Sequence, residues 1–469
     1  MRAPRWWRSV PLELWVLTAL AVATRFWRLF TPNLRVWDEV YVQEYASRYF
    51  TGSFYFDVHP PLAKLLFALT AWVAHVPPER FANAASMPQL RVLSALMGSL
   101  LVPTFWMMLR ELDATRKVAA LGATCLLLDN ALLVQSRFVL TDIVLLWFGI
   151  AAVTAYLAAR RSSGARRLVW LGLAAVLAGA AASTKWTGLT ALGLIGATWL
   201  LEVLRATPRP RLRRLVVEGA MLAVLPAAVY VGSFALHFAL LPNNGPGVQT
   251  MSADFAATRR GNPSYREEAR IAFAEELAEW HRSAMETNLG WSSLQHVAAS
   301  KWYTWPVSKH RIMLWGSAGE GPGDERRIDI QGNPVLWYGV LAALALFVAA
   351  LGLHRASVGA QQWTLLFLGA GYVMNFVPFA FISRPMYLYH YYFALVYSIA
   401  AAAFAAGLLA GWQADDGPPW RFVTPRARTL YFGVIALVAA SFVYFAPLSY
   451  GTSLSAESAA QRRWVLERQ

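Results

Sequence analysis

Long apolar runs alternate with short polar or basic segments along almost the whole chain. Most runs reach about 20 residues, the length that a helix needs to cross the hydrocarbon core of a bilayer. The pattern predicts about eleven transmembrane helices, near Leu12–Phe30, Gln89–Leu109, Val118–Val134, Phe138–Ala159, Leu168–Thr184, Thr187–Leu204, Leu215–Leu241, Pro334–Leu353, Trp363–Phe381, Met386–Gly411 and Leu430–Phe445. We therefore expect an all-α polytopic membrane protein that forms one integral-membrane unit over residues 1–469.

The composition supports this interpretation and excludes a soluble globular protein. Of the 469 residues, 57% are hydrophobic and 15% are charged, and a soluble domain of this length has too little interior to cover so much apolar surface. The single cysteine, Cys125, lies in an apolar run, so the chain forms no intramolecular disulfide and no cysteine-based metal cluster.

The first apolar run leaves two interpretations open. The stretch before Thr24 has a basic start, an apolar middle and an Ala-Val-Ala tail, as a cleaved signal peptide does. The apolar run continues through Phe26 and Trp27, which favours a retained membrane anchor.

Basic residues lie at alternate junctions between the apolar runs. A net charge of +15 would suggest nucleic-acid binding in a soluble protein, but the short cytoplasmic loops of membrane proteins also collect Lys and Arg. These junctions contain Arg2, Arg5 and Arg8; Arg110, Arg116 and Lys117; Arg160, Arg161, Arg166 and Arg167; Arg205, Arg209, Arg211, Arg213 and Arg214; Arg355; and Arg421, Arg426 and Arg428. Because all of them fall on one side, we predict a cytoplasmic amino terminus, an external carboxyl terminus and no nucleic-acid partner.

Two long segments, residues 31–88 and 242–333, fall on the opposite, external face. In the second, apolar residues recur at steps of three and four between acidic ones, at Tyr265, Ala269, Phe273, Leu277, Trp280 and Ala284. This spacing predicts an amphipathic helix, which we expect to lie on the outer membrane interface.

The first external segment carries an adjacent acidic pair, Asp38 and Glu39, directly after a predicted helix. Neighbouring side chains on regular structure do not face one point, so the pair needs an irregular backbone or two different roles. A carboxylate beside the membrane can accept a hydroxyl proton during glycosyl transfer. A solvated acidic pair in a loop explains the composition equally simply.

A second motif, Asp57-Val-His59-Pro-Pro61, follows in the same segment. The two prolines predict a rigid turn that leads into a helix, which is a purely structural role. Asp57 and His59 then either position a substrate or cap that helix.

Further ionisable side chains occur where predicted helices meet the outer face: Arg91, Asp129, Arg137, Asp142, Lys185, Arg384 and His390. Charged groups at this depth are costly and usually face a polar cavity or an opposite charge. Arg91, Lys185 and Arg384 would suit a lipid phosphate at headgroup level, although each alone is explained by a side chain that extends to the interface. Arg137 and Asp142 are five residues apart, so mutual neutralisation is an equally good explanation.

Four tyrosines surround His390, at Tyr387, Tyr389, Tyr391 and Tyr392. Tyrosine collects at membrane–water interfaces, so we expect these residues to form an interfacial belt. A tyrosine that lines the site is the alternative.

Taken together, these motifs resemble the protein O-mannosyltransferases that use a polyprenyl-phosphate mannose donor, dolichyl-phosphate mannose in eukaryotes. The resemblance covers most of the chain, in order: Trp37-Asp-Glu-Val40, Phe56-Asp-Val-His-Pro-Pro-Leu-Ala-Lys64, Asp129-Asn130, Gln135-Ser-Arg-Phe-Val-Leu-Thr-Asp142, Ser183-Thr-Lys-Trp-Thr-Gly188, Lys301-Trp-Tyr-Thr-Trp-Pro306, Gly332-Asn-Pro334, Asn375-Phe-Val-Pro-Phe379 and Tyr387-Leu-Tyr-His-Tyr391. Eukaryotic members carry a β-trefoil MIR domain in the large external loop. Segment 242–333 is too short for it and its pattern is helical, so the chain resembles a bacterial member.

The resemblance implies a GT-C glycosyltransferase fold with about eleven transmembrane helices and an active site on the external face of the plasma membrane. It implies that Asp38 is the catalytic base and that Glu39 organises the acceptor and sugar site. The residues expected to bind the donor phosphate or the substrate are Arg91, His59, Lys185, Arg137, Arg384 and His390. For His59, organisation of the loop is the alternative.

The function implied is transfer of mannose from a polyprenyl-phosphate carrier to Ser or Thr of exported polypeptides, with inversion at the anomeric carbon. A related transferase that uses another lipid-phosphate sugar or a glycolipid acceptor remains an alternative. A transporter is disfavoured, because the sequence has neither repeated halves nor paired helix breaks.

The expected partners are the lipid donor, the bilayer, the exported polypeptides and, through the shared location, the export translocon. We expect no required cofactor, since an arginine can neutralise the leaving phosphate. An Asp-Glu pair can also recruit a divalent metal, which remains the alternative.

Overall fold

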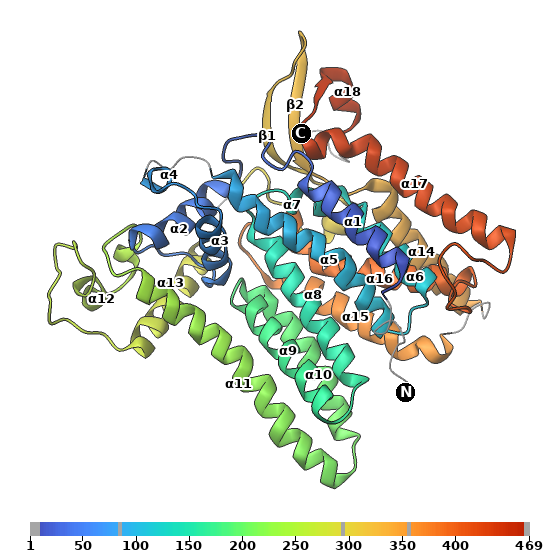
Figure 1. The fold of residues 1–469 in the computed structure, drawn as a ribbon, viewed down its shortest axis with the longest axis horizontal. Coiled ribbons are helices and arrows are strands. Elements are labelled where there is room, and N and C mark those ends of the chain that lie inside the picture. Colours follow the sequence, from blue (N-terminus) through green and yellow to red (C-terminus); the bar gives the residue numbers. More distant parts are fainter. Residues whose placement is uncertain (1–9, 83–86, 292–295, 354–357, 464–469) are drawn as a thin grey trace.

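The computed structural model describes residues 10–82, 87–291, 296–353 and 358–463. Figure 1 shows a mainly helical molecule with a β-hairpin projecting from one end. At its centre α5 (Arg91–Glu111), α8 (Thr141–Arg160) and α16 (Tyr392–Leu409) bury most of their side chains. By contrast, α11 (Pro208–Leu240) and α17 (Pro425–Tyr450) leave most of their apolar side chains uncovered, as helices that face lipid do.

Each predicted apolar run contains a helix, but fewer of these helices than predicted have the length of a span. Within the described residues, nine helices are long and apolar enough to cross a membrane, against the eleven expected. The nine include α9 (Gly164–Ala182), α14 (Pro334–Gly352), α10 (Leu189–Leu204) together with the 3-10 turn before it, and α15 (Gln362–Phe376) together with the 3-10 turns on both sides of it. The two shorter helices are α1 (Leu12–Phe26), with 15 residues, and α6 (Arg116–Leu127), with 12 residues.

The predicted run Val118–Val134 is broken because a carboxylate ends it. Asp129 follows α6 and caps the short helix α7 (Asn130–Gln135), accepting a hydrogen bond of 2.8 Å from the backbone N–H of Leu132. The same carboxylate accepts a bond of 2.6 Å from the indole N–H of Trp337 and one of 3.2 Å from the backbone N–H of Asn333. Asp129 therefore joins the α6–α7 turn to the start of α14.

Segment 31–88 is folded into helices α2 (Glu39–Thr51), α3 (Leu62–Val73) and α4 (Pro78–Ala82), with a 3-10 turn at Pro88–Leu90. Segment 242–333 contains α12 (Ala253–Ala257), α13 (Phe273–Gly290), a 3-10 helix at Trp302–Val307 and a β-hairpin.

The amphipathic helix predicted in segment 242–333 begins later than expected. Helix α13 starts at Phe273, and Tyr265 and Ala269 lie in separate turns before it. Its apolar face is covered by protein, since Trp280 is 2% exposed and its ring lies 4.6 Å from that of Phe234 on α11. The expectation that this face lies in the membrane interface is therefore wrong for Trp280.

The hairpin of β1 (Ile312–Ala318) and β2 (Asp324–Ile330) was not predicted from the sequence. It belongs to a three-stranded antiparallel sheet of order β1-β2-β3, in which β3 (Ser453–Ser455) follows α17 and precedes α18 (Ala456–Gln461). The sheet thus links the second long segment to the carboxyl-terminal part of the chain.

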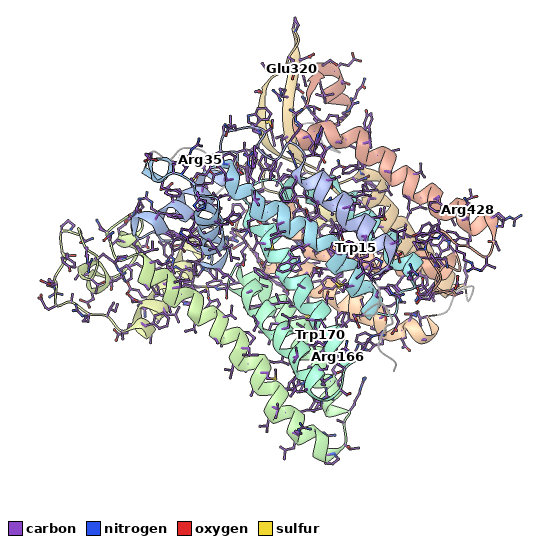
Figure 2. The ribbon with its side chains drawn as sticks, viewed as in Figure 1. Trp15, Arg35, Arg166, Trp170, Glu320 and Arg428 are labelled. Carbon is purple, nitrogen blue, oxygen red and sulfur yellow. The ribbon has the colours of Figure 1, made fainter. Side chains whose placement is uncertain are left out.

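Part of the basic charge pattern lies within the described residues. Arg2, Arg5, Arg8 and Arg355 lie outside the described residues. In Figure 2, Arg166 and Arg428 from the predicted cytoplasmic set lie well away from Arg35 and Glu320, which belong to the two predicted external segments.

Asp129→Ala should strongly destabilise the fold, because it leaves three donors without their acceptor in a buried site. An unsatisfied buried group costs about 1–3 kcal/mol, so we expect the free energy of unfolding to fall by at least about 3 kcal/mol. The measurement is denaturant unfolding of the detergent-solubilised protein. Trp337→Phe, which removes only one of the donors, serves as the control and should cost clearly less.

Candidate active site

A cavity of about 680 Å³ opens at the end of the bundle where the start of α2 meets the start of α8 and the segment before α16. Its lining is rich in charged and aromatic side chains. It comprises Trp37, Asp38, Tyr41, Val42, Tyr45, Asp57, Val58, His59, Lys64, Leu140, Thr141, Asp142, Lys185, Trp291, His296, Arg384, Pro385, Tyr387, Tyr389 and His390. The cavity therefore brings together Asp38, His59, Lys185, Arg384 and His390, five of the eight residues expected at a site.

The two adjacent acids Asp38 and Glu39 point to different places because the chain turns sharply here. Trp37 has a positive φ of 49°, and a turn from Val36 carries the backbone into α2, which Asp38 precedes as its N-cap. Asp38 lines the cavity, and no described residue forms a hydrogen bond with its carboxylate. The irregular backbone required by the sequence is therefore present, and the two acids have separate environments.

Burial raises the pKa of Asp38 to about 6. The positive charge of Lys185 acts in the opposite direction, while the negative charges of Asp142 and Asp57 raise the pKa further. A carboxyl group with this pKa is mostly ionised at neutral pH and still a better proton acceptor than an ordinary aspartate.

Glu39 and Arg91 do not line the cavity, which differs from the expectation for both. They form a fully buried ion pair with two short contacts, Nε to Oε1 at 2.8 Å and Nη2 to Oε2 at 2.7 Å. Glu39 also accepts hydrogen bonds from the backbone N–H groups of Val36 and Val139, at 3.1 Å and 2.8 Å.

The other donors of Arg91 are equally occupied. Its two terminal nitrogens donate to the backbone carbonyls of Leu29, Pro32 and Leu34 at 2.8–3.2 Å. Because these bonds and the pair with Glu39 use the guanidinium, the expected contact of Arg91 with a donor phosphate does not agree with its position.

Arg137 is also placed away from the cavity. It is fully buried, and its terminal nitrogens donate to the carbonyls of Ser449, Trp27 and Arg28 at 2.7–3.2 Å. The ion pair considered between Arg137 and Asp142 is absent, because Asp142 pairs with Lys185 instead.

Lys185 and Asp142 form an ion pair on the cavity wall, with Nζ 2.8 Å from Oδ1 and 2.9 Å from Oδ2. Lys185 lies in the connection between α9 and α10, and Asp142 lies in the first turn of α8. A Cβ on the nearby Gly188 would lie 2.4 Å from the backbone of Ala181, so only glycine permits this tight connection. Local packing thus fixes the place of the lysine.

A second lysine organises the loop that contains His59. The ammonium of Lys64 donates to Asp57 Oδ2 at 2.7 Å and to the carbonyls of His59 and Pro60 at 2.7 Å and 2.8 Å. Burial lowers the pKa of His59 well below its usual value, and the charges of Lys185, Lys64 and Arg384 act in the same direction. His59 is therefore neutral at physiological pH.

Arg384 and His390 enter the cavity from the segment before α16. The guanidinium of Arg384 donates to the side-chain carbonyl of Asn288 and lies 5.8 Å from the Trp291 ring. The ring of His390 stacks on Trp305, with a centroid distance of 6.0 Å and an interplanar angle of 13°.

The four tyrosines around His390 do not form the interfacial belt that was expected. Tyr387 and Tyr389 line the cavity, whereas Tyr391 and Tyr392 are buried within the protein. The alternative considered from the sequence, that a tyrosine lines the site, is the one found.

The sequence analysis missed several residues that line the cavity, although the helical spacing of some of them could have been recognised. Asp38, Tyr41, Val42 and Tyr45 follow the spacing i, i+3, i+4, i+7 and share one face at the start of α2. No sequence pattern indicated His296. It lies far along the chain from Trp37, although the centroids of the two rings are 5.6 Å apart.

A separate apolar pocket of about 300 Å³ adjoins the cavity and shares three lining residues with it, Asp142, Tyr389 and His390. Its other walls are mainly apolar side chains from α8, α15 and α16, among them Leu145 and Phe393. A charged cavity therefore borders an apolar pocket between helices. Within the described residues, no three His, Cys, Asp or Glu side chains are grouped so that they could hold a metal ion.

Two family descriptions match the chain. Dolichyl-phosphate-mannose-protein mannosyltransferase matches residues 15–242, and the C-terminal four-TMM region of protein-O-mannosyltransferase matches residues 273–468. Protein O-mannosyltransferase 1 of Drosophila melanogaster is 36% identical over 272 residues, which are 54% of this chain and 30% of that protein. Protein O-mannosyl-transferase 1 of Mus musculus is 32% identical over 273 residues, 54% of this chain and 37% of that protein. The matched part thus spans about a third of the length of these curated relatives.

Solved structures share the fold. A chain of the Saccharomyces cerevisiae Pmt1-Pmt2 complex bound to the sugar donor has a TM-score of 0.84 at 18% identity, covering 97% of this chain and 93% of that one. ArnT from Cupriavidus metallidurans bound to undecaprenyl phosphate has a TM-score of 0.53 at 16% identity, covering 94% of this chain and 71% of that one. At these identities the likeness shows a polytopic membrane fold of the GT-C type.

The ion pair between Glu39 and Arg91 should behave as a structural unit. Glu39→Gln or Arg91→Met alone leaves a buried charge without its partner, so we expect each to lower the free energy of unfolding by about 3–5 kcal/mol. The double variant should lose less than the sum of the two, since it strands no charge.

Denaturant unfolding of the four proteins in detergent gives this double-mutant cycle. The matched control is Glu44→Gln, which breaks the half-exposed pair of Glu44 with Arg48 on α2 and should cost less than about 1 kcal/mol. An Arg91→Met protein of unchanged stability would contradict the assignment.

Proposed function

Since the chain belongs to the protein O-mannosyltransferase family, we propose that it transfers mannose from a polyprenyl-phosphate-mannose donor to Ser and Thr hydroxyls of exported polypeptides. The names of its relatives support a lipid-phosphate mannose as the donor and a protein as the acceptor. The observation that carries the proposal is the position of Asp38, whose carboxylate faces a cavity lined by cations without a hydrogen-bond partner among the described residues.

In the proposed reaction Asp38 is the general base. Its carboxylate takes the proton of the acceptor hydroxyl while the hydroxyl oxygen forms a bond to the anomeric carbon of mannose. The bond between that carbon and the phosphate oxygen breaks, and the polyprenyl phosphate leaves with the electron pair. A single displacement of this kind inverts the configuration at the anomeric carbon.

Two cations are suited to the leaving phosphate. Lys185 and Arg384 both line the cavity, and neither of them occupies all its donors in the described contacts. Positive groups placed before the reaction at the position where negative charge develops lower the barrier without reorganisation. Arg91 has no part in this step, because its guanidinium is held by Glu39 and three carbonyls.

The apolar pocket between α8, α15 and α16 is suited to the first prenyl units of the carrier. It shares Asp142, Tyr389 and His390 with the cavity, so a phosphate near Lys185 can continue into an apolar environment. A lipid chain gains free energy from such burial, and no nucleotide-binding fold is needed for the donor.

We place the cavity on the external face of the plasma membrane and the amino terminus in the cytoplasm. The basic junctions support this orientation, since short cytoplasmic loops collect positive charge. Segments 31–88 and 242–333 are then external, and exported polypeptides reach the site as they leave the translocon. His59 and His390 complete the substrate site as neutral or stacked rings on the cavity wall.

Asp38→Asn should lower kcat for mannose transfer by about 100- to 10,000-fold, because an amide accepts no proton at neutral pH. The assay uses purified protein, synthetic polyprenyl-phosphate mannose and a Thr-containing peptide. Binding of the donor should be retained, since the amide keeps the size of the carboxylate.

Glu44→Gln also converts a carboxylate of α2 into an amide, but at a residue that does not line the cavity, so this control should leave transfer unchanged. Normal transfer by Asp38→Asn would refute the base assignment. No transfer by the unaltered protein would favour another lipid-phosphate sugar or a glycolipid acceptor.

The rate of transfer should also depend on pH in a defined direction. Only the ionised carboxylate accepts a proton, so kcat/KM should rise as the pH passes through about 6 and level off above it. At pH 5 about one carboxyl in ten is ionised, so the rate should be about ten-fold below the plateau.

Asp142→Asn tests the cause of this pKa. It removes a negative charge that raises the pKa of Asp38. The rise of kcat/KM with pH should therefore occur at lower pH. Glu44→Gln should leave the pH of this rise unchanged. If kcat/KM of the unaltered protein did not change between pH 5 and 7, the assignment of Asp38 as the base would be contradicted.

A further inference from the structure

The sheet at the end of the molecule has two edge strands, and β1, with 7 residues, is longer than β3, with 3. Its strand order is β1-β2-β3, so β2 is paired on both sides and β1 on one side only within the described residues. In Figure 1 the outer side of β1 faces away from α18 and α17, and Figure 2 places Glu320 at the projecting tip of the hairpin.

The charges of the two strands are distributed in an unusual way. Strand β1 contains no charged residue and no proline, whereas the central strand β2 contains Asp324, Glu325, Arg326, Arg327 and Asp329. Proteins normally protect a free edge with charges or prolines, since its unpaired N–H and C=O groups are a template for another strand. Strand β1 has neither, and its register with β2 is irregular only between Met313 and Trp315, so the regular part Trp315–Ala318 is chemically suited to pairing.

The outward backbone groups can be assigned from the register. The N–H of Gly319 donates to the carbonyl of Asp324 at 2.7 Å, and the pairs Ala318–Glu325, Ser317–Arg326 and Gly316–Arg327 continue the same register. Hydrogen-bonded and non-hydrogen-bonded pairs alternate in an antiparallel ladder. Ser317 therefore bonds to β2, while Gly316 and Ala318 direct their N–H and C=O groups to the free side.

The segment that leads into β1 packs against the wall of the cavity. Trp305, which stacks on the cavity residue His390, precedes the first residue of β1, Ile312, by only seven positions. A chain of seven residues spans at most about 25 Å. The sheet and the cavity also share one end of the bundle, because β2 leads into the start of α14 and Asp38 follows the end of α1.

We propose that the free edge of β1 binds the acceptor polypeptide as an added antiparallel or parallel strand and so presents its Ser and Thr residues to the cavity. The proposal rests on the proposed function, since it names the surface that holds the acceptor of that reaction. Backbone pairing is independent of sequence, which suits an enzyme that must accept hydroxyls in many different polypeptides. An unfolded polypeptide supplies the extended backbone that such pairing requires.

The test measures binding without the transfer reaction. A fluorescent 20-residue peptide in which every Ser and Thr is replaced by Ala is titrated with the full-length protein in detergent, and its polarisation is followed. Ala318→Pro removes one outward N–H, and losing one such hydrogen bond should raise Kd about five-fold. Ala318→Val keeps the N–H and serves as the matched control with unchanged Kd.

A second measurement does not depend on the fold of a variant. Peptides carrying a single N-methyl group at successive positions are titrated against the unaltered protein, and Kd should rise at every second position. That period of two is a signature of strand pairing, since alternate N–H groups point to the partner strand. Equal Kd for all N-methylated peptides would overturn the proposal, as would an unchanged Kd for a folded Ala318→Pro protein.

Two further outcomes separate the alternatives. If Ala318→Pro converts a dimer into a monomer, the edge pairs with a second copy of the chain and the proposal is wrong. Mannose transfer to a five-residue Thr peptide tests the proposed function alone, since so short a peptide does not reach both sites. If the five-residue peptide receives no mannose while binding of the long peptide weakens at every second N-methyl position, the proposed transfer reaction is wrong. The proposal that β1 binds a polypeptide then still stands.

Discussion

The buried ion pair between Glu39 and Arg91 is the contact on which the geometry of the cavity depends. It fixes the start of α2 against the start of α5, and the carbonyls of Leu29, Pro32 and Leu34 bind the same guanidinium. The connection after α1 is thereby held in place. Because Glu39 is held inside, the preceding Asp38 is left at the cavity surface. One acid stabilises the fold so that its neighbour is free for chemistry.

Among the charged groups of the cavity, too, some are paired and one carboxylate is left without a partner. Lys64 is paired with Asp57, and Lys185 with Asp142, so two cations and two anions cancel in part. Asp38 has no such partner among the described residues, and its burial together with the two nearby aspartates raises its pKa. The pairs therefore do more than hold loops in place, because they set the proton affinity of the remaining carboxylate.

The sequence was sufficient for features that depend on local composition. Apolar runs specify helices, and in the part of the chain that the structure describes nine of the eleven expected have the length of a span. One of the two exceptions, the run that contains α6, depends on a single event that a hydropathy pattern does not contain, the capping of α7 by Asp129. The hairpin was missed because β1 is uncharged without clear alternation and β2 is mostly charged, so neither strand shows the usual period of two.

The site was predictable where one motif supplies both the residue and its surroundings. The turn at Trp37 places Asp38 at the cavity, and the short connection before α10 places Lys185 there. The prediction that Arg91 binds the donor phosphate failed because its partner Glu39 lies 52 positions away in the sequence. No local pattern shows which cation a buried acid will pair with. Long-range pairing decides whether a charge at the membrane surface is structural or available to a ligand.

The cavity has two unlike sides, and this asymmetry fits the reaction proposed. On one side it borders the apolar pocket through Tyr389 and His390. On another, Trp37, His296 and Tyr387 form a cluster of rings with centroids 5.4–6.2 Å apart. An inverting displacement requires the hydroxyl and the leaving phosphate on opposite faces of the anomeric carbon. In the proposed reaction the lipid chain lies in the apolar pocket, so the hydroxyl has to approach from the face of the sugar that Asp38 lines.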